Sequence, residues 1–195
     1  MDLFQPHILI ADDDPDTIEL LDFKLRGADY RVDSTDDGQK ALFEIRQNGY
    51  HGAVLDHNFM QPPNGASVAL DARAARPELV IVLNSSESAE GEELRRLQES
   101  GVYFSHKDAD RVVVYFNGQF ALARAGILSG ERVLLRNINE DEGLVATYQK
   151  RLPEEGAHYF HLSNGMGISI VPDDYFTVED RTIIYRGSRL FPAVL

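Results

Sequence analysis

Short apolar runs recur along the first two thirds of the chain at nearly constant intervals. Five of them begin 23, 23, 26 and 23 residues apart, at residues 7–11 (HILIA), 30–34 (YRVDS), 53–55 (AVL), 79–83 (LVIVL) and 102–106 (VYFSH). Runs of this length that are rich in β-branched and aromatic residues are typical of buried strands. Between them lie segments whose apolar residues recur at helical spacing. This region is therefore predicted to alternate strands and helices.

Residues that start and stop helices agree with this alternation. Asp14 can cap a helix that has Pro15 at its first position. A fifth helix is predicted over residues 111–125, although Gly118 lowers its helix propensity. A strand and a helix repeated five times predict an α/β fold: a (βα)5 domain over residues 1–126, with a doubly wound, parallel, five-stranded sheet and helices on both faces.

The pattern changes after residue 126, where apolar and polar residues alternate with a period of two. Five short strands are predicted in this part, at residues 131–138, 144–152, 157–163, 167–171 and 181–186. The pair Asn164 and Gly165 is the strongest hairpin signal of the chain. Residues 127–195 are therefore predicted to form a small all-β barrel or meander. So short a unit is marginal alone and is expected to pack on the first domain or on a second copy.

Composition and charge narrow the classes of partner. The chain has 195 residues, no Cys and a formal charge of −13, and it has no apolar run near the ~20 residues of a membrane helix. With no basic, apolar leader at its start, a cytoplasmic location is expected. Residues 1–127 carry 22 acidic and 12 basic side chains, and residues 128–195 carry 10 and 7. Nucleic acid is therefore an improbable partner for either part.

Polar side chains stand where four of the predicted strands end. The carboxyl ends of parallel strands meet at one edge of a sheet, where ligands bind. The side chains expected at this edge are Asp12, Asp13, Asp14, Asp56, Asn84, Ser85, Ser86 and Lys107. Clustered carboxylates repel one another, and Mg²⁺, which prefers oxygen ligands, is the natural compensation. A metal and an ammonium group could also neutralise a phosphoryl group, which an aspartate can accept covalently.

These residues closely resemble the receiver domain of two-component response regulators, over about residues 6–125. The resemblance implies a signalling protein, not an enzyme, that takes a phosphoryl group from a sensor histidine kinase or a phosphotransfer protein. By position, it implies Asp56 as the phosphoacceptor and Mg²⁺ as the metal. The other implied site residues are Asp12 and Asp13 as metal ligands, Asn58 through its backbone carbonyl, Lys107 at the phosphoryl oxygens and Phe104 as the aromatic switch. It also implies a possible homodimer through the face of the fourth helix, fifth strand and fifth helix.

Three features depart from the family's pattern. Asn84 stands where the family has a Thr or Ser whose hydroxyl follows the phosphoryl group, unless Ser85 takes that place. Asp108 replaces the Pro that usually follows the lysine, and the loop between Asp56 and Gly65 is one residue longer. Asn84 and Asp108 favour an alternative, a pseudo-receiver adaptor that acts by binding without phosphorylation.

Other readings explain fewer residues. Asp12 and Asp14 match the D-x-D motif of haloacid-dehalogenase-like phosphatases, but that reading leaves Asp56 without a task. In the second part, RVLLR (residues 132–136) and HLSNGMG (161–167) faintly resemble the cyclic-dinucleotide site of PilZ domains. A LytTR-like DNA-binding output is disfavoured by the local net charge of −3. The preferred hypothesis is that the β unit contacts an unidentified downstream protein.

Overall fold

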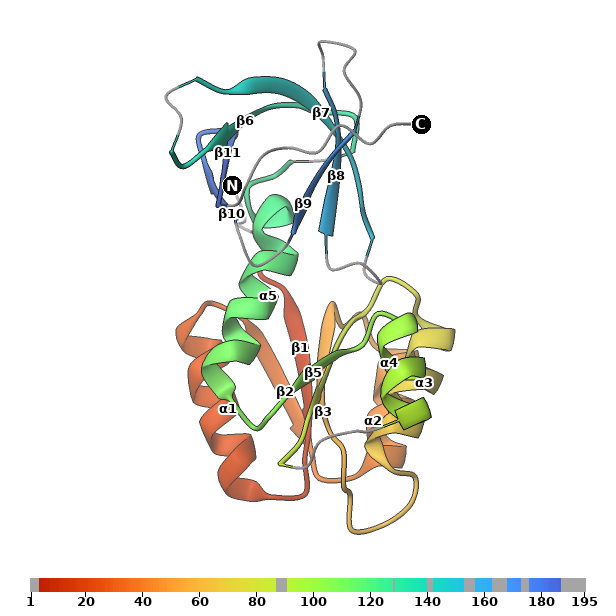
Figure 1. The fold of residues 1–195 in the computed structure, drawn as a ribbon. Helices are drawn as coiled ribbons and strands as arrows, with labels where there is room; N and C mark the ends of the chain where they lie inside the picture. The colour runs from red at the N-terminus through yellow and green to blue at the C-terminus, as the bar shows by residue number, and fades with distance from the viewer. Residues whose placement is uncertain are drawn as a thin grey trace. The chain divides into compact units, whose positions relative to one another are not determined.

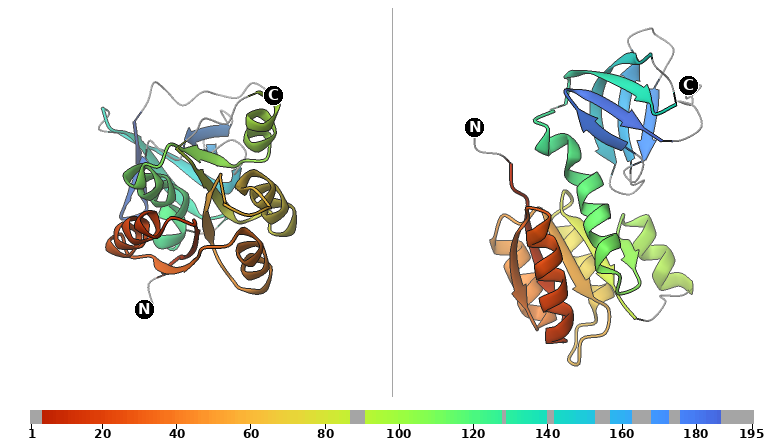
Figure 2. Two further views of the ribbon diagram at one scale, coloured as in Figure 1. Left: turned by 90° about the horizontal axis from the view of Figure 1, so that it is seen from below. Right: turned by 90° about the vertical axis from the view of Figure 1, so that its left-hand side faces the viewer.

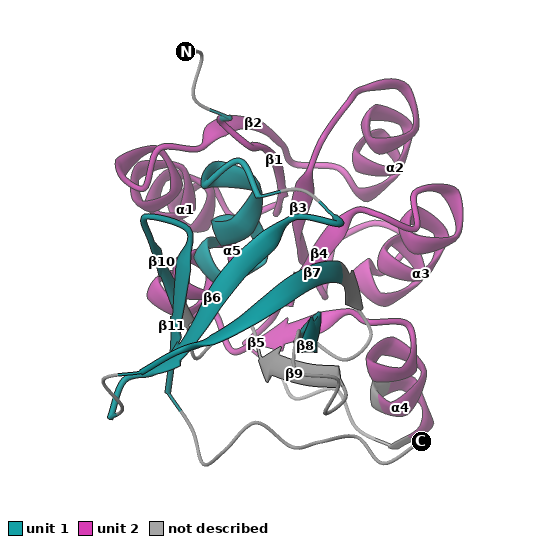
Figure 3. Cartoon of the chain, turned by 90° about the horizontal axis from the view of Figure 1, so that it is seen from above, with its two compact units in different colours: residues 1–4, 117–195 teal, residues 5–116 magenta. Residues whose placement is uncertain are grey.

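The computed structural model describes residues 4–86, 91–127, 129–139, 142–152, 157–162, 168–172 and 176–186. The chain divides into two compact units, one of residues 5–116 and one of residues 117–195 with the first four residues (Figure 3). The division falls within a helix, whereas the sequence predicts a boundary after residue 126. Each unit is described by itself.

The first unit alternates strands and helices as predicted. Its elements are β1 (His7–Ala11), α1 (Pro15–Gly27), β2 (Arg31–Thr35), α2 (Gly38–Gln47), β3 (Gly52–Asp56), α3 (Gly65–Ala75), β4 (Val80–Asn84), α4 (Gly91–Glu99), β5 (Tyr103–Ser105) and the first part of α5 (Ala109–Arg124). The strands form a parallel sheet in the order β2-β1-β3-β4-β5. The five predicted strands and the (βα)5 fold are confirmed.

Helices cover both faces of this sheet, with α1 and α5 on one face and α2, α3 and α4 on the other (Figures 1 and 2). The central strands β3 and β4 are buried along their whole length, which is why their sequences are apolar runs without alternation. Gly52 shows how closely α5 packs. A Cβ at Gly52 would lie 2.7 Å from Phe116 Cε1 and 2.9 Å from Ile8 Cδ1.

The helix starts follow from short polar side chains. The carboxylate of Asp14 accepts hydrogen bonds from the Asp16 N–H and the Thr17 hydroxyl, and Pro15 occupies the first turn, as predicted. Asp108 plays the same part for α5, because its Oδ1 accepts the N–H of Arg111 at 3.1 Å. The residue that replaces the family's Pro therefore caps the helix.

The second unit contains one strand more than predicted. Its strands are β6 (Arg132–Asn137), β7 (Leu144–Leu152), β8 (Ala157–Leu162), β9 (Ile168–Pro172), β10 (Phe176–Glu179) and β11 (Thr182–Tyr185), in the sheet order β10-β11-β6-β7-β8-β9. Strands β6 to β9 form an antiparallel meander, while β11 pairs with β6 in parallel. The predicted hairpin pair Asn164 and Gly165 lies outside the described residues.

Strand β10 was missed because its turn carries no glycine signal. The turn between β10 and β11 places Asp180 and Arg181 in the left-handed region, with φ of 44° and 62°. Two left-handed residues make the turn that twists with a hairpin, and Asn-Gly is the usual sequence for it. An Asp-Arg pair gives no such indication.

The core of the second unit includes part of α5. Leu122 is 2% exposed and packs with Val133, Phe160 and Ile183. The same helix supplies Phe116 to the first unit, where it is fully buried. Each of these two side chains of α5 is therefore buried within its own unit. Within the described residues, no helix is long and apolar enough to cross a membrane.

Candidate functional site

Three carboxylates converge at the carboxyl edge of the first sheet. Asp12 and Asp13 follow β1 and Asp56 ends β3, and one oxygen of each lies within 4.8 Å of the others. Asp12 is 1% exposed and Asp56 is 4% exposed. The structure therefore brings together three of the four acidic residues that the sequence predicts at this edge, while the fourth, Asp14, caps α1.

Lys107 bridges two of these carboxylates. Its Nζ lies 2.6 Å from Asp12 Oδ2 and 3.0 Å from Asp56 Oδ1. Burial by itself would lower the pKa of Lys107, but hydrogen bonds to both carboxylates outweigh burial and hold that pKa above its ordinary value. Lys107 is therefore charged at neutral pH and offsets part of the negative charge of the cluster.

The negative charge of Asp12 is disfavoured where it lies. Burial raises the pKa of its carboxyl above the ordinary value, and the hydrogen bonds from Lys107 and the Asp14 N–H only partly oppose this. Three carboxylates against one ammonium group leave net negative charge in a partly buried place. That charge can be balanced by a cation.

The donor set fits Mg²⁺. The Asn58 N–H donates to Asp56 Oδ2 at 2.9 Å, and the Met60 N–H donates to Asp13 Oδ2 at 2.6 Å. Each carboxylate oxygen can accept a hydrogen bond and still offer a lone pair to a metal. Mg²⁺ is usually bound by one or two carboxylates together with several waters. The role of the Asn58 carbonyl as a metal ligand stays a prediction.

The predicted switch residues lie on the neighbouring strands. Asn84 ends β4 in register with Asp56, and its side chain is 1% exposed, with no hydrogen-bond partner for Oδ1 in the part of the chain that the structure describes. Ser85 is equally buried, and its N–H donates to the Ser105 carbonyl. Phe104 on β5 is half-buried and meets the His106 ring edge-on. The structure does not test their predicted roles in a switch.

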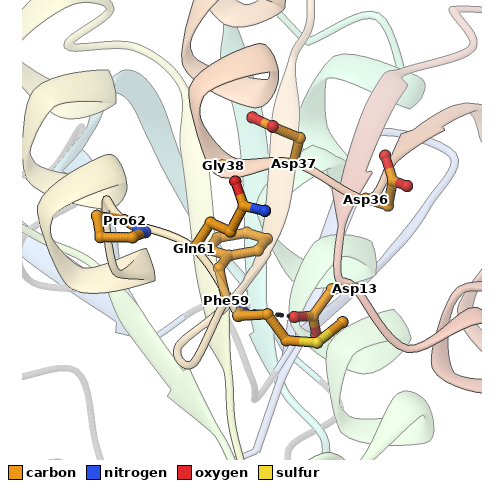
Figure 4. Close-up of a pocket in the computed structure, with 8 residues that line it drawn as sticks. Asp13, Asp36, Asp37, Gly38, Phe59, Gln61 and Pro62 are labelled. Carbon is orange, nitrogen blue, oxygen red and sulfur yellow. Dashed lines mark hydrogen bonds between the residues drawn. The ribbon is translucent and has the colours of Figure 1, made fainter.

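Sequence reasoning missed an acidic pair beside the cluster. Asp36 and Asp37 follow β2 and line a hollow of about 230 Å³ together with Asp13 and Phe59 (Figure 4). Asp37 also caps α2 by accepting the Lys40 N–H at 2.8 Å. The same rule on strand ends would have found this pair, because Asp36 and Asp37 directly follow the last residue of the second strand, Thr35.

Known proteins show similarity to the first unit. The family model of the response regulator receiver domain matches residues 8–114. A CheY-like response regulator receiver domain protein from Methanospirillum hungatei JF-1 is 16% identical, with a TM-score of 0.55 over 63% of this chain and 98% of that chain. The N-terminal domain of a response regulator/sensory box/GGDEF 3-domain protein from Carboxydothermus hydrogenoformans is 19% identical, with a TM-score of 0.52 over 63% and 99%. The BeF3-activated DrrB receiver domain is 20% identical, with a TM-score of 0.51 over 58% and 96%. No curated protein matches the chain.

Proposed function

Because the chain belongs to the response regulator receiver domain family, which matches residues 8–114, we propose that it is a two-component response regulator phosphorylated on Asp56. The phosphoryl group would come from a sensor histidine kinase or a phosphotransfer protein. The family is mainly a signalling module, so we propose at most self-catalysed phosphorylation and dephosphorylation. The cytoplasmic location expected from the sequence stays a prediction.

One observation carries this proposal. The Lys107 ammonium group lies within 3.0 Å of oxygens on two buried carboxylates that come from different strands. Removing two carboxylates from water is costly unless charge partners compensate. A sheet edge used only for packing has no need of this arrangement. A site for a phosphoryl group and its metal needs it, because carboxylates must bind the metal and an ammonium group must offset the negative charge of the phosphoryl group.

The transfer itself needs few steps. A carboxylate oxygen of Asp56 attacks the phosphorus of a phosphohistidine donor. The P–N bond breaks, and the leaving imidazole nitrogen keeps its electron pair. In the unphosphorylated structure Lys107 contacts the carboxylates of Asp12 and Asp56. After the transfer it would donate to the phosphoryl oxygens instead. When bound by Asp12, Asp13 and Asp56, Mg²⁺ supplies further positive charge to those oxygens.

Asn84 is proposed to take the place of the family's hydroxyl. A carboxamide carries two N–H donors besides its carbonyl oxygen, so it can donate to a phosphoryl oxygen. Among the described residues, Asn84 Oδ1 has no hydrogen-bond partner, and buried groups of this kind often mark functional sites. Movement of Asn84, Ser85 and Phe104 would then pass the change toward downstream contacts.

Phosphorylation of the full chain tests the proposal. The protein would be incubated with Mg²⁺ and acetyl phosphate, or with Mg²⁺ and beryllofluoride as a phosphoryl mimic. We expect a mass increase of one phosphoryl group, and a beryllofluoride-dependent spectral change, in the wild type. Asp56→Asn should abolish both, whereas Asp71→Asn, at an exposed position on α3, should change neither. A wild-type protein that responds to neither reagent would overturn the proposal.

The second candidate is an adaptor that works without phosphorylation. Lys107 already contacts both Asp12 and Asp56, so the site has partial charge compensation without a metal. Asn84 and Asp108 also depart from the family's pattern. Titration with Mg²⁺ followed by calorimetry separates the two functions, because an adaptor would show no saturable binding at millimolar Mg²⁺.

The second unit is proposed to pass the signal on through protein contacts. Neither its downstream partner nor a homodimer is shown, and both stay predictions. The PilZ-like and LytTR-like readings also stay open as lesser hypotheses. Arg132 and Arg136 share one face of β6, with Arg132 exposed and Arg136 half-buried, but most of the 161–167 motif lies outside the described residues.

A further inference from the structure

The described side chains of helix α4 make few buried contacts with the first unit. Of the α4 side chains that the structure describes, Leu97 alone is buried. A hollow of about 230 Å³ lies between α4 and α3, lined by Ala66, Ser67, Leu70, Glu92, Glu93 and Arg96. An element with few buried apolar contacts opens locally at low free-energy cost. The few contacts that hold α4 therefore have a large influence on its position.

One of these contacts leads directly to the phosphoacceptor. Nε2 of His57 lies 3.3 Å from Oε2 of Glu93, and His57 follows Asp56 in the chain. The His57 side chain is 12% exposed, and its Nδ1 is buried with no hydrogen-bond partner among the described residues. The imidazole thus depends on Glu93 for its side-chain interaction.

The backbone around His57 has little freedom. The Gly65 N–H donates to the His57 carbonyl at 2.9 Å. A Cβ on Gly65 would lie only 1.7 Å from the Asp56 carbonyl oxygen, which shows how closely the start of α3 approaches this backbone. His57 is therefore a firm attachment point, and the mobile partner of the contact is Glu93.

We propose that the contact between His57 and Glu93 tethers the first turn of α4 to the phosphoacceptor strand and holds the resting arrangement. The inference rests on the proposed function, because a phosphoryl group on Asp56 would favour a second, activated arrangement over the resting one. Asn84 must reorient to donate to that group, and Asn84 ends the strand that leads into α4. The tether resists any accompanying shift of α4. Removing it lowers the cost of the activated arrangement, and by linkage it strengthens binding of a phosphoryl mimic.

The test compares Glu93→Ala with Glu92→Ala in the full chain. Both residues lie in the first turn of α4, so both substitutions remove the same favourable charge from the helix start. Glu92 is 79% exposed and its ion pair is with Arg95 at 4.0 Å. We expect Glu93→Ala to speed amide hydrogen exchange in residues 91–99 and to lower the half-saturating beryllofluoride concentration roughly fivefold or more, the lower range of allosteric couplings. Glu92→Ala should do neither.

A double-mutant cycle makes the assignment specific. His57→Ala, which leaves no polar group to contact Glu93, should reproduce the effects of Glu93→Ala, and the two substitutions together should add little to either alone. Equal behaviour of Glu93→Ala and Glu92→Ala would overturn the tether. If the wild type does not bind beryllofluoride, the proposed function and the coupling both fail. Exchange in α4 still decides whether the tether exists, because it needs no phosphoryl mimic.

Discussion

The ammonium nitrogen of Lys107 lies 2.6 Å from Oδ2 of Asp12, a residue that is 1% exposed. The same nitrogen reaches Asp56 at 3.0 Å. Lys107 thus occupies the space between the metal ligands and the phosphoacceptor. It competes with a metal for the carboxylates, but it attracts a phosphoryl group. Loss of Lys107 should therefore change the affinity for Mg²⁺ and the affinity for a phosphoryl group in opposite directions.

Lys107→Ala is expected to tighten Mg²⁺ binding by about tenfold, or ~1.4 kcal/mol. This is well below the ~4 kcal/mol of two unit charges 4 Å apart at the effective dielectric of a protein surface. The same variant should lose beryllofluoride binding. Calorimetry measures both. Lys24→Ala removes an equal charge from α1, where Lys24 pairs with Asp110, and should change neither affinity. Weaker Mg²⁺ binding in Lys107→Ala would contradict the competition.

Asn84→Asp is expected to weaken beryllofluoride binding, with at least a tenfold rise in the half-saturating concentration. The two side chains have the same shape, but the aspartate replaces an N–H donor with a further acceptor beside Asp56. Asn84→Thr restores a donating hydroxyl and should bind within a few-fold of the wild type. If Asn84→Asp binds as the wild type does, Asn84 does not contact the phosphoryl group.

Gly65→Ala is expected to destabilise the first unit by about 1–3 kcal/mol, the usual cost of forcing extra volume into a packed site. The added Cβ would lie 1.7 Å from the Asp56 carbonyl oxygen, so the phosphoacceptor backbone must move. Urea unfolding measures the stability, and Mg²⁺ titration reports on the displaced carboxylate. Gly49→Ala is the control, because its Cβ meets nothing within 4 Å. Equal stabilities for the two variants would contradict the close approach.

Acidification is expected to destabilise the first unit through His51. Its Nδ1 accepts the His7 N–H at 3.0 Å, so the bonded form is the neutral imidazole. Burial lowers the pKa of His51, and His7 and Arg76 lower it further. The unfolded chain therefore binds more protons near its ordinary value of about 6.5, and stability is lost as pH falls below that value.

His51→Asn tests this pH dependence. The Asn oxygen can replace Nδ1 as the acceptor but does not titrate, so stability should fall less steeply below pH of about 6.5. The remaining slope includes His7, whose pKa is also lowered by burial. Urea unfolding midpoints measured over a pH series give the slope of stability against pH for each protein. Parallel slopes for the wild type and His51→Asn would show that His51 does not cause the loss of stability.

The first sheet was predictable because its chemistry is local. Its central strands are buried on both faces, so apolar runs mark them directly, and polar residues at their carboxyl ends mark the site. The contact between His57 and Glu93 was not predictable, because it depends on how α4 packs rather than on a strand end. Strand β10 was also missed, since its turn uses Asp180 and Arg181 where a glycine signal is usual.

The boundary between the two parts falls at different residues by sequence pattern and by compactness. The sequence changes its period after residue 126, because that is where the strands begin. The compact units separate earlier, within α5, because Leu122 is buried with residues of the β unit. Hydrophobic periodicity locates elements of secondary structure, but it does not say which core each apolar side chain joins.

Leu122→Ala is therefore expected to destabilise the second unit by about 2–5 kcal/mol, the usual cost of a cavity at a buried leucine. The first unit should keep its stability and its Mg²⁺ affinity, because Leu122 belongs to the core of the other unit. Hydrogen exchange in strands β6 and β11 would report the loss, and exchange in β1 and β3 would show what is retained. Val114→Ala on the same helix, where Val114 is 57% exposed, should change neither unit. Equal destabilisation of both units by Leu122→Ala would mean that they unfold together, with α5 as their common core element.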